Sequence, residues 1–173
     1  MKTHPALRKL LLLLLALPLV CHAQFASNLN NRTAKGTFYV SVDDGATIYV
    51  NGQKFYDAPL NESRSPEMEL KTGDRIVVHL RNDTAGRRFL MLFAGSDGQT
   101  IVSFRARDFK IVPDMEVVDF TPEQLAKWQK QPKTEHRKDN LPVKGYSDWM
   151  WGDHDKSIIA GTVTAQMFSQ RPK

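Results

Sequence analysis

Two adjacent carboxylates, Asp43 and Asp44, are the first residues of the chain whose type and spacing suggest chemistry. Paired carboxylates in a loop suit calcium, which takes roughly six to eight oxygen ligands. Asn51 cannot join them, because the strand between the two sites separates them by about 17 Å at ~3.3 Å per residue. Calcium would need a ligand from another loop, and the candidates are Asp74, Asp83 and Asp97. The alternative is that the aspartates serve only to form a turn.

Aromatic residues in two places could stack on the flat faces of sugar rings. In the strand register derived below, Tyr39 lies opposite Tyr49 on the outer face of a sheet, and Tyr56 lies on the next strand. Trp149 and Trp151 are two residues apart, so an extended segment places both indoles on one side. The alternatives are cross-strand packing or burial for the tyrosines, and a buried plug at one end of the domain for the tryptophans.

Enzyme motifs are missing from the sequence: there is no G-x-S-x-G, no H-E-x-x-H and no phosphate-binding loop. His154, paired with Asp153 or Asp155, could in principle act as a general base. We therefore expect the chain not to be an enzyme, and a small hydrolase is the least favoured alternative.

The N-terminus has the three parts of a secretory signal peptide: a basic region, an apolar run over residues 10–20 and a small residue at Ala23. The apolar run is shorter than the roughly 20 residues that a membrane-spanning helix needs. We expect cleavage near Ala23, a secreted or periplasmic protein, and no transmembrane span. Lipidation of Cys21 is an alternative, although Val20 is bulkier than the small residue that usually precedes such a cysteine.

Removal of the signal peptide changes the charge and the cysteine content. The full chain has 24 Lys and Arg against 19 Asp and Glu, a net charge of +5. Loss of Lys2, Arg8 and Lys9 leaves 21 cations against 19 carboxylates, a net charge of +2. Nucleic acid, which requires a concentrated basic patch, is therefore not an expected partner. Cys21, the one cysteine, is lost too, so stability must come from burial without a disulfide.

Strict alternation of apolar and polar residues predicts two half-buried strands near the start of the mature chain. The apolar positions share one face; they are Phe38, Val40, Val42, Ala46, Ile48 and Val50. A three-residue turn at residues 43–45 keeps this face together by placing Val40 opposite Ile48. A slip of one residue would expose the whole set to water, so the register is strongly specified.

Further strands follow at short intervals. Asn51-Gly52 is the strongest two-residue hairpin signal, and it pairs Val50 with Gln53 and Ile48 with Phe55. A loop is expected over residues 58–66. Strands are expected at residues 68–70, 75–80, 88–93, 100–105 and 115–118. Residues 88–93 are apolar on both faces of the expected strand, so this strand is expected to be central and covered on both sides.

The C-terminal third adds a short helix over about residues 121–131. Thr121 is a typical N-cap, Pro122 suits the first helical position and Gln124 completes a capping box. Leu125 and Trp128 give the helix one apolar face. The Trp-rich segment comes next, and a closing strand over residues 157–164 is expected beside the first strand, because an unpaired edge is a liability.

The pattern as a whole predicts an all-β fold, an antiparallel β-sandwich or jelly roll with one short helix and a Trp-rich C-terminal segment. The expected organisation is a signal peptide (residues 1–23), a flexible lead-in (24–35) and a single domain (36–170).

Residues 43–53, followed by residues 70–78, resemble galactose-binding-domain-like jelly rolls, which occur beside catalytic domains in secreted glycoside hydrolases. Protective-antigen-type lectin domains look similar, and there a paired aspartate helps to bind calcium. The resemblance ends near Phe109. It implies a jelly-roll fold and carbohydrate binding, and it implies calcium at Asp43 and Asp44.

We therefore expect a secreted, non-catalytic module, a monomer, that binds a carbohydrate or envelope polymer, with calcium as the one cofactor considered. Its predicted ligand-binding residues are Tyr39, Tyr49, Tyr56, Trp149 and Trp151, and its predicted metal ligands are Asp43 and Asp44. The alternative is a structural or protein-interaction module of the cell envelope with a protein partner.

Overall fold

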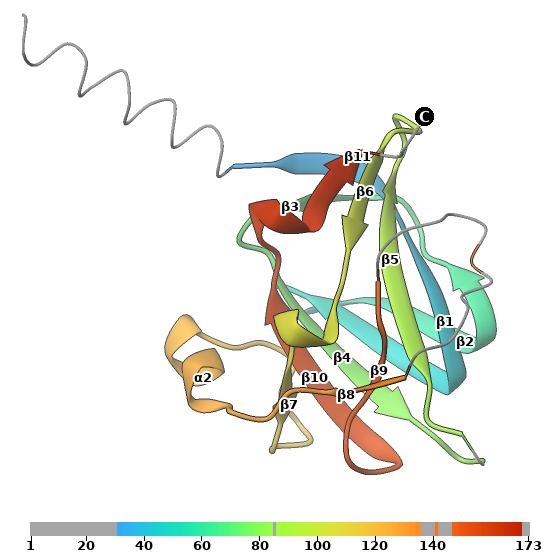
Figure 1. Ribbon diagram of the computed structural model, residues 1–173, viewed down its shortest axis with the longest axis vertical. Coiled ribbons are helices and arrows are strands. Elements are labelled where there is room, and N and C mark those ends of the chain that lie inside the picture. The colour runs from blue at the N-terminus through green and yellow to red at the C-terminus, as the bar shows by residue number, and fades with distance from the viewer. Residues whose placement is uncertain (1–30, 85, 136–140, 142–146, 171–173) are drawn as a thin grey trace, which may run out of the picture.

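One strand of 18 residues, β1 (Thr33–Val50), runs through the centre of the fold. The computed structural model describes residues 31–84, 86–135, 141 and 147–170. Around β1 the described residues form a curled antiparallel sheet and one short α-helix (Figure 1). The further strands are β2 (Gln53–Arg64), β3 (Met68–Lys71), β4 (Arg75–Arg81), β5 (Phe89–Gly95), β6 (Thr100–Ser103), β7 (Lys110–Val112), β8 (Lys133–Glu135), β9 (Trp149–Trp151), β10 (Lys156–Thr162) and β11 (Phe168–Gln170). The helices are α2 (Pro122–Lys127) and two 3-10 turns, η1 (Ala106–Asp108) and η2 (Ala165–Met167).

The predicted turn at residues 43–45 is wrong, because β1 continues through it. The strand bends there instead of reversing. Asp44 has a φ of 71°, and the register with β2 shifts between Val42 and Gly45. A β-bulge of this kind bends a strand and increases its twist. The predicted core face is nevertheless confirmed, since its six apolar residues are all buried in one cluster.

Both edges of β1 are paired along nearly its whole length. On one edge, β2 pairs with residues 39–50 and β3 continues the edge by pairing with residues 33–36. On the other edge, β4 pairs with residues 45–50 and β5 with residues 36–42. Consequently β4 and β5 lie end to end along β1, and the bend in β1 falls where they meet.

The bend divides the sheet into two layers that face each other across the core. β6 and then β11 extend the layer that contains β5, whereas β10 and then β7 extend the layer that contains β4. β9 pairs with β5, and β8 pairs with β9. The result is the predicted all-β sandwich, in which β1 and β2 belong to both layers (Figure 1).

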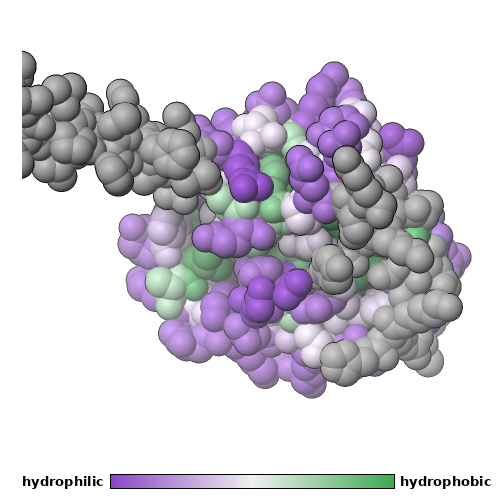
Figure 2. Space-filling view, turned by 45° about the horizontal axis from the view of Figure 1, so that its top comes forward, coloured by the Kyte–Doolittle hydropathy of each residue, from purple (hydrophilic) through white to green (hydrophobic). Residues whose placement is uncertain are grey.

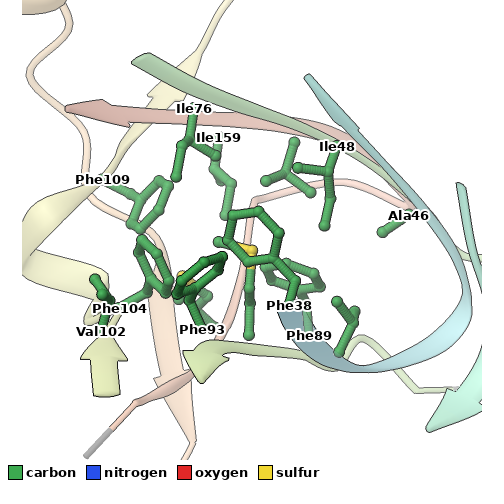
Figure 3. Packing of buried hydrophobic residues seen from close by; sticks show 14 of the residues in the cluster. Phe38, Ala46, Ile48, Ile76, Phe89, Phe93, Val102, Phe104, Phe109 and Ile159 are labelled. Atoms are coloured by element: carbon green, nitrogen blue, oxygen red, sulfur yellow. The ribbon is translucent and has the colours of Figure 1, made fainter. Parts of the chain in front are cut away.

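The core between the layers is rich in phenylalanine. The rings of Phe38, Phe93, Phe104 and Phe109 face one another, and Ile48, Ile76 and Ile159 lie opposite them (Figure 3). The ring centroids of Phe38 lie 5.2 Å from Phe93 and 5.9 Å from Phe104. The surface seen in Figure 2 is mainly hydrophilic, with hydrophobic residues visible between the polar ones.

Two smaller apolar clusters lie on the outer faces of the layers. One joins Leu90, Leu92, Ala94 and Ile101 to Leu141. The other joins Val77, Ile158 and Ala160 to Val112 and Phe120, with Leu125 and Trp128 packed against it. Because β5 faces the core on one side and the first of these clusters on the other, all seven of its residues are buried, as predicted.

Several local predictions are confirmed and several are shifted. Asn51-Gly52 forms the hairpin turn and pairs Val50 with Gln53. Ile48 pairs with Tyr56 and not with Phe55, because a second irregularity lies between Ile48 and Tyr49. Strand β2 occupies much of the predicted loop at residues 58–66.

The elements after residue 110 differ from the prediction in their length or in the strands with which they pair. The Thr121 capping box is present, but α2 ends at Lys127. Residues 115–118 form no strand. The closing strand β10 pairs with β4 and β7 and not with β1, whose edges are already occupied by β2, β3, β4 and β5.

Residues 82–84 and 86–88, which follow β4 and precede β5, hold the bend in β1. Asp44 Oδ2 accepts hydrogen bonds from the backbone N–H of Asp83 (2.7 Å) and Thr84 (3.0 Å) and from the Thr84 hydroxyl (3.0 Å). The Asp43 N–H donates to the Arg88 carbonyl (2.9 Å), and Arg88 Nη2 lies 3.4 Å from Asp43 Oδ2. Gly86 has a φ of 133° and lies against the Asp43 side chain, so that a Cβ at this position would collide with the Asp43 carboxylate.

Replacing Asp44 by Ala is expected to destabilise the fold, because it removes three hydrogen bonds to the loop. Asp83→Ala is the matched control, since it removes only the exposed Arg81–Asp83 ion pair and keeps the backbone N–H. Urea unfolding at neutral pH should show the larger loss for Asp44→Ala, and the loss should be the same with calcium and with a chelator. A loss that appears only with calcium would contradict the structural role of Asp44.

The Asp44 contribution should also depend on pH. Hydrogen bonds from the backbone N–H of Asp83 and from Thr84 hold the pKa of Asp44 below its usual range. A carboxyl group whose pKa is lower in the folded state stabilises the fold above the ordinary aspartate pKa of about 4. This stabilisation is lost as the pH falls through the lower pKa of the folded state. The difference between wild type and Asp44→Ala should therefore shrink in acid.

Candidate functional site

The predicted tyrosine platform is not assembled. Tyr39 and Tyr49 lie on the same strand, so their predicted pairing is wrong. Tyr39 packs on the outer cluster of β5, with the Arg64 guanidinium 5.5 Å from its ring centroid. Tyr49 packs on the outer cluster of β4, and its ring lies 4.8 Å from that of His79. Tyr56 is half-buried against the main core.

The two predicted tryptophans also belong to different clusters. Trp151 is only 3% exposed, packs in the main core and donates from Nε1 to the His154 carbonyl (2.8 Å). Trp149 is half-buried against the outer cluster of β5, and its Nε1 is buried without a hydrogen-bond partner. Both line a hollow of about 160 Å³ beside Arg87 and Arg88, so their exposed parts form a small recess there.

The predicted metal ligands are engaged in the fold. The Asp44 carboxylate binds the loop after β4, and the Asp43 carboxylate pairs with Arg88. Within the described residues, no three or more His, Cys, Asp or Glu side chains gather closely enough to hold a metal ion. Asp74, one candidate for a further ligand, is 3% exposed and accepts hydrogen bonds from Asn51 and Lys71. In the described residues, the predicted ligands therefore make contacts within the fold and do not gather into a cluster of carboxylates.

The two carboxylates beside His154 in the sequence both contact cations. The Asp153 carboxylate pairs with Lys130 and, at 3.6 Å, with Lys133. The Asp155 carboxylate pairs with Arg87 at 2.8 Å. Both carboxylates that could have oriented His154 are therefore bound to cations.

A concave surface is formed by residues of β1, β2, β4, β7 and β10 together with the segment that contains α2, and we call it the α2 groove. It consists of two adjoining hollows of about 560 and 570 Å³ that share Met115 and Lys156. The first is lined by Gly45, Ala46, Thr47, Asp57, Ala58, Pro59, His79, Leu80 and Arg81 in addition to the shared pair. The second is lined by Ile111, Val112, Pro113, Lys127, Trp128, Gln129, Lys130, Asp153, His154 and Ser157 in addition to the shared pair.

The segment that forms one wall of the groove, residues 111–130, is fixed to the sandwich at several points. Arg75 binds Asp119 through two hydrogen bonds, of 2.6 and 2.9 Å. His79 Nε2 lies 2.7 Å from the Val117 carbonyl, which makes Nε2 the donor. Helix α2 lies outside the sandwich next to β7 and β10 (Figure 1), and the Trp128 ring packs at 5.8 Å from Phe120. The groove is therefore formed on a fixed support.

Apolar and cationic side chains line this groove together. Met115 is 47% exposed, one of two large hydrophobic side chains that stand out from the described surface. Trp128 is half-buried, so part of its indole faces the second hollow. The lining cations are Arg81, Lys127, Lys130 and Lys156, and the lining carboxylates are Asp57 and Asp153.

Both lining carboxylates are already matched by lysines. Lys54 Nζ lies 2.6 Å from Asp57, and its hydrogen bond holds the pKa of Asp57 below the usual range. The pairing with Lys130 does the same for the pKa of Asp153. Each carboxylate is therefore ionised and neutralised at neutral pH.

The sequence contained only part of this site. The sequence places Trp128 on the apolar face of a helix, whereas no local pattern marks Met115, Lys127 or Lys156 as part of a binding site. They come together because β10 pairs with β4 and with β7, two contacts between distant parts of the chain. No periodicity or motif specifies either pairing.

Comparison of the chain with protein-family models, with curated proteins and with solved structures finds no match. The resemblance to galactose-binding-like jelly rolls therefore rests on the two sequence stretches alone. Among the described residues, no helix has the length and apolar character needed to cross a membrane.

The Arg75–Asp119 pair that fixes the groove wall should respond to acid. The hydrogen bond from Arg75 is the main cause that lowers the pKa of Asp119, and the side chains are 35% and 37% exposed. Because the pKa of Asp119 is lowered in the folded state, its ion pair stabilises the fold above about pH 4. This stabilisation is lost as the pH falls through the pKa of Asp119 in the folded state.

Asp119→Asn should therefore lower the unfolding free energy at neutral pH by about 0.5–1 kcal/mol, the scale of a half-exposed pair. Urea unfolding at pH 7 and pH 3 measures the difference. Wild type and variant should converge at the lower pH. A difference that stays constant with pH would show that the Asp119 charge does not fix the wall.

Proposed function

We propose that this chain is an extracytoplasmic, non-catalytic binding module that holds a segment of envelope polysaccharide in the α2 groove. The observation that carries the proposal is the pair of adjoining hollows, which share Met115 and Lys156 and are supported by paired strands. Binding sites are usually concave, largely preformed and apolar with a few polar groups. The signal-peptide pattern of residues 1–23 supports an extracytoplasmic location.

Trp128 and Met115 are the expected apolar contacts of the sugar rings. Aromatic side chains offer a large flat surface at a low cost in conformational freedom. The half-buried position of Trp128 fixes its ring against Phe120 while leaving one part open to the groove. This role replaces the tyrosine and tryptophan platform expected from the sequence.

A protein partner is the second candidate, because one edge of β2 remains open in the described part of the chain. An open edge can accept an added strand. Exposed Lys54, Asp57, Glu62 and Arg64 lie along β2, however, and Pro59 within it has no N–H to donate. Charges and proline protect strand edges from pairing, so the α2 groove is the better-supported site.

Trp128→Leu should weaken polysaccharide binding while keeping an apolar residue against Phe120. Loss of an aromatic contact at the centre of an interface costs on the order of 2 kcal/mol, or roughly 30-fold in Kd. Trp149→Leu is the matched control, because Trp149 lines a different hollow. Binding is measured on a glycan array and on insoluble cell-wall polysaccharides, with and without calcium, using residues 24–173.

Wild type and Trp149→Leu should bind alike. Retention of wild type on no polysaccharide would overturn the proposed function. Loss of binding in Trp149→Leu but not in Trp128→Leu would place the site at the tryptophan segment instead. Circular dichroism spectra of all variants exclude unfolding as the cause.

A further inference from the structure

The charges of the α2 groove identify the chemical class of its ligand. Two of the four lining cations are in ion pairs. Lys130 is paired with Asp153, and Arg81 Nε lies 2.9 Å from Asp83 Oδ2. Within the described residues, Lys127 and Lys156 lie in no ion pair. The groove therefore carries two positive charges that its own carboxylates do not match.

The positions of the two lysines matter as much as their charge. Lys156 lies where the two hollows meet, and Lys127 lies in the last turn of α2 within the second hollow, next to Trp128. The adjacent acidic residues Asp114 and Glu116 flank Met115 but line neither hollow. A ligand in the groove thus meets an apolar surface with a cation at its middle and another toward one end.

We propose that the bound polymer is a uronic-acid polysaccharide, whose carboxylates lie against Lys156 and Lys127 while its sugar rings contact Trp128 and Met115. This inference rests on the proposed function and specifies its ligand. Carboxylates at intervals along a chain match two cations placed along a groove. Nucleic acid would place a phosphate on every residue and requires a denser cluster of cations.

The test compares two polymers with the same backbone and different charge: polygalacturonate and its fully methyl-esterified form. Wild type should bind polygalacturonate about tenfold more tightly, the combined effect of two exposed ion pairs. Affinity for polygalacturonate should fall with salt at a slope of about −1.4 on logarithmic axes, as for two contacts to a flexible polyanion. Affinity for the ester should not change with salt.

The double variant Lys127→Gln, Lys156→Gln should bind both polymers equally and without salt dependence. Lys71→Gln, at an exposed position in β3, is the control for loss of a positive charge elsewhere and should behave like wild type. A control that loses as much affinity as the double variant would overturn the assignment to these two lysines.

The outcomes separate this inference from the proposed function. Equal binding of both polymers by wild type overturns the inference and leaves polysaccharide binding standing. Binding of neither polymer, nor of any other polysaccharide, overturns both. Tighter binding of polyglutamate or single-stranded DNA than of polygalacturonate at equal charge overturns the choice of a sugar polymer and indicates a peptide or nucleic-acid ligand.

Discussion

The structure depends on the bend in β1 at Asp43 and Asp44. A single strand pairs with β5 before the bend and with β4 after it, and these two strands lie end to end on the same edge. The loop that joins them crosses the bend and is held there by the Asp44 carboxylate. The bend therefore sets the angle between the two layers, and with it the space that the phenylalanine core fills.

The site follows from the same constraint. Because β1 supplies both layers, each layer keeps an outer face, and apolar residues on these faces must be covered. Residues 111–130 cover part of the outer face of β4 and β10, and this cover lines the α2 groove together with residues of β1, β2, β4 and β10. The ion pair of Arg75 with Asp119 and the His79 contact hold this cover at a fixed distance from the strands.

The sequence predicted much of the fold and little of the site. Period-two alternation placed Phe38 and Ile48 on one buried face, and local chemistry correctly located the Asn51-Gly52 turn and the Thr121 capping box. The same local reasoning failed at Asp43 to Gly45. Residues that favour a turn also suit a bulge with positive φ. The contact that decides between them, Asp44 with Asp83, joins residues 39 positions apart, and no local pattern records it.

The most direct test of the bent strand is a nuclear Overhauser experiment on isotopically labelled protein. The account predicts backbone contacts from Val40 to Met91 and from Ile48 to Val78, which place one strand beside both β5 and β4. A hairpin at residues 43–45 would instead place Val40 beside Ile48. Observation of that contact, with loss of the other two, would contradict the account.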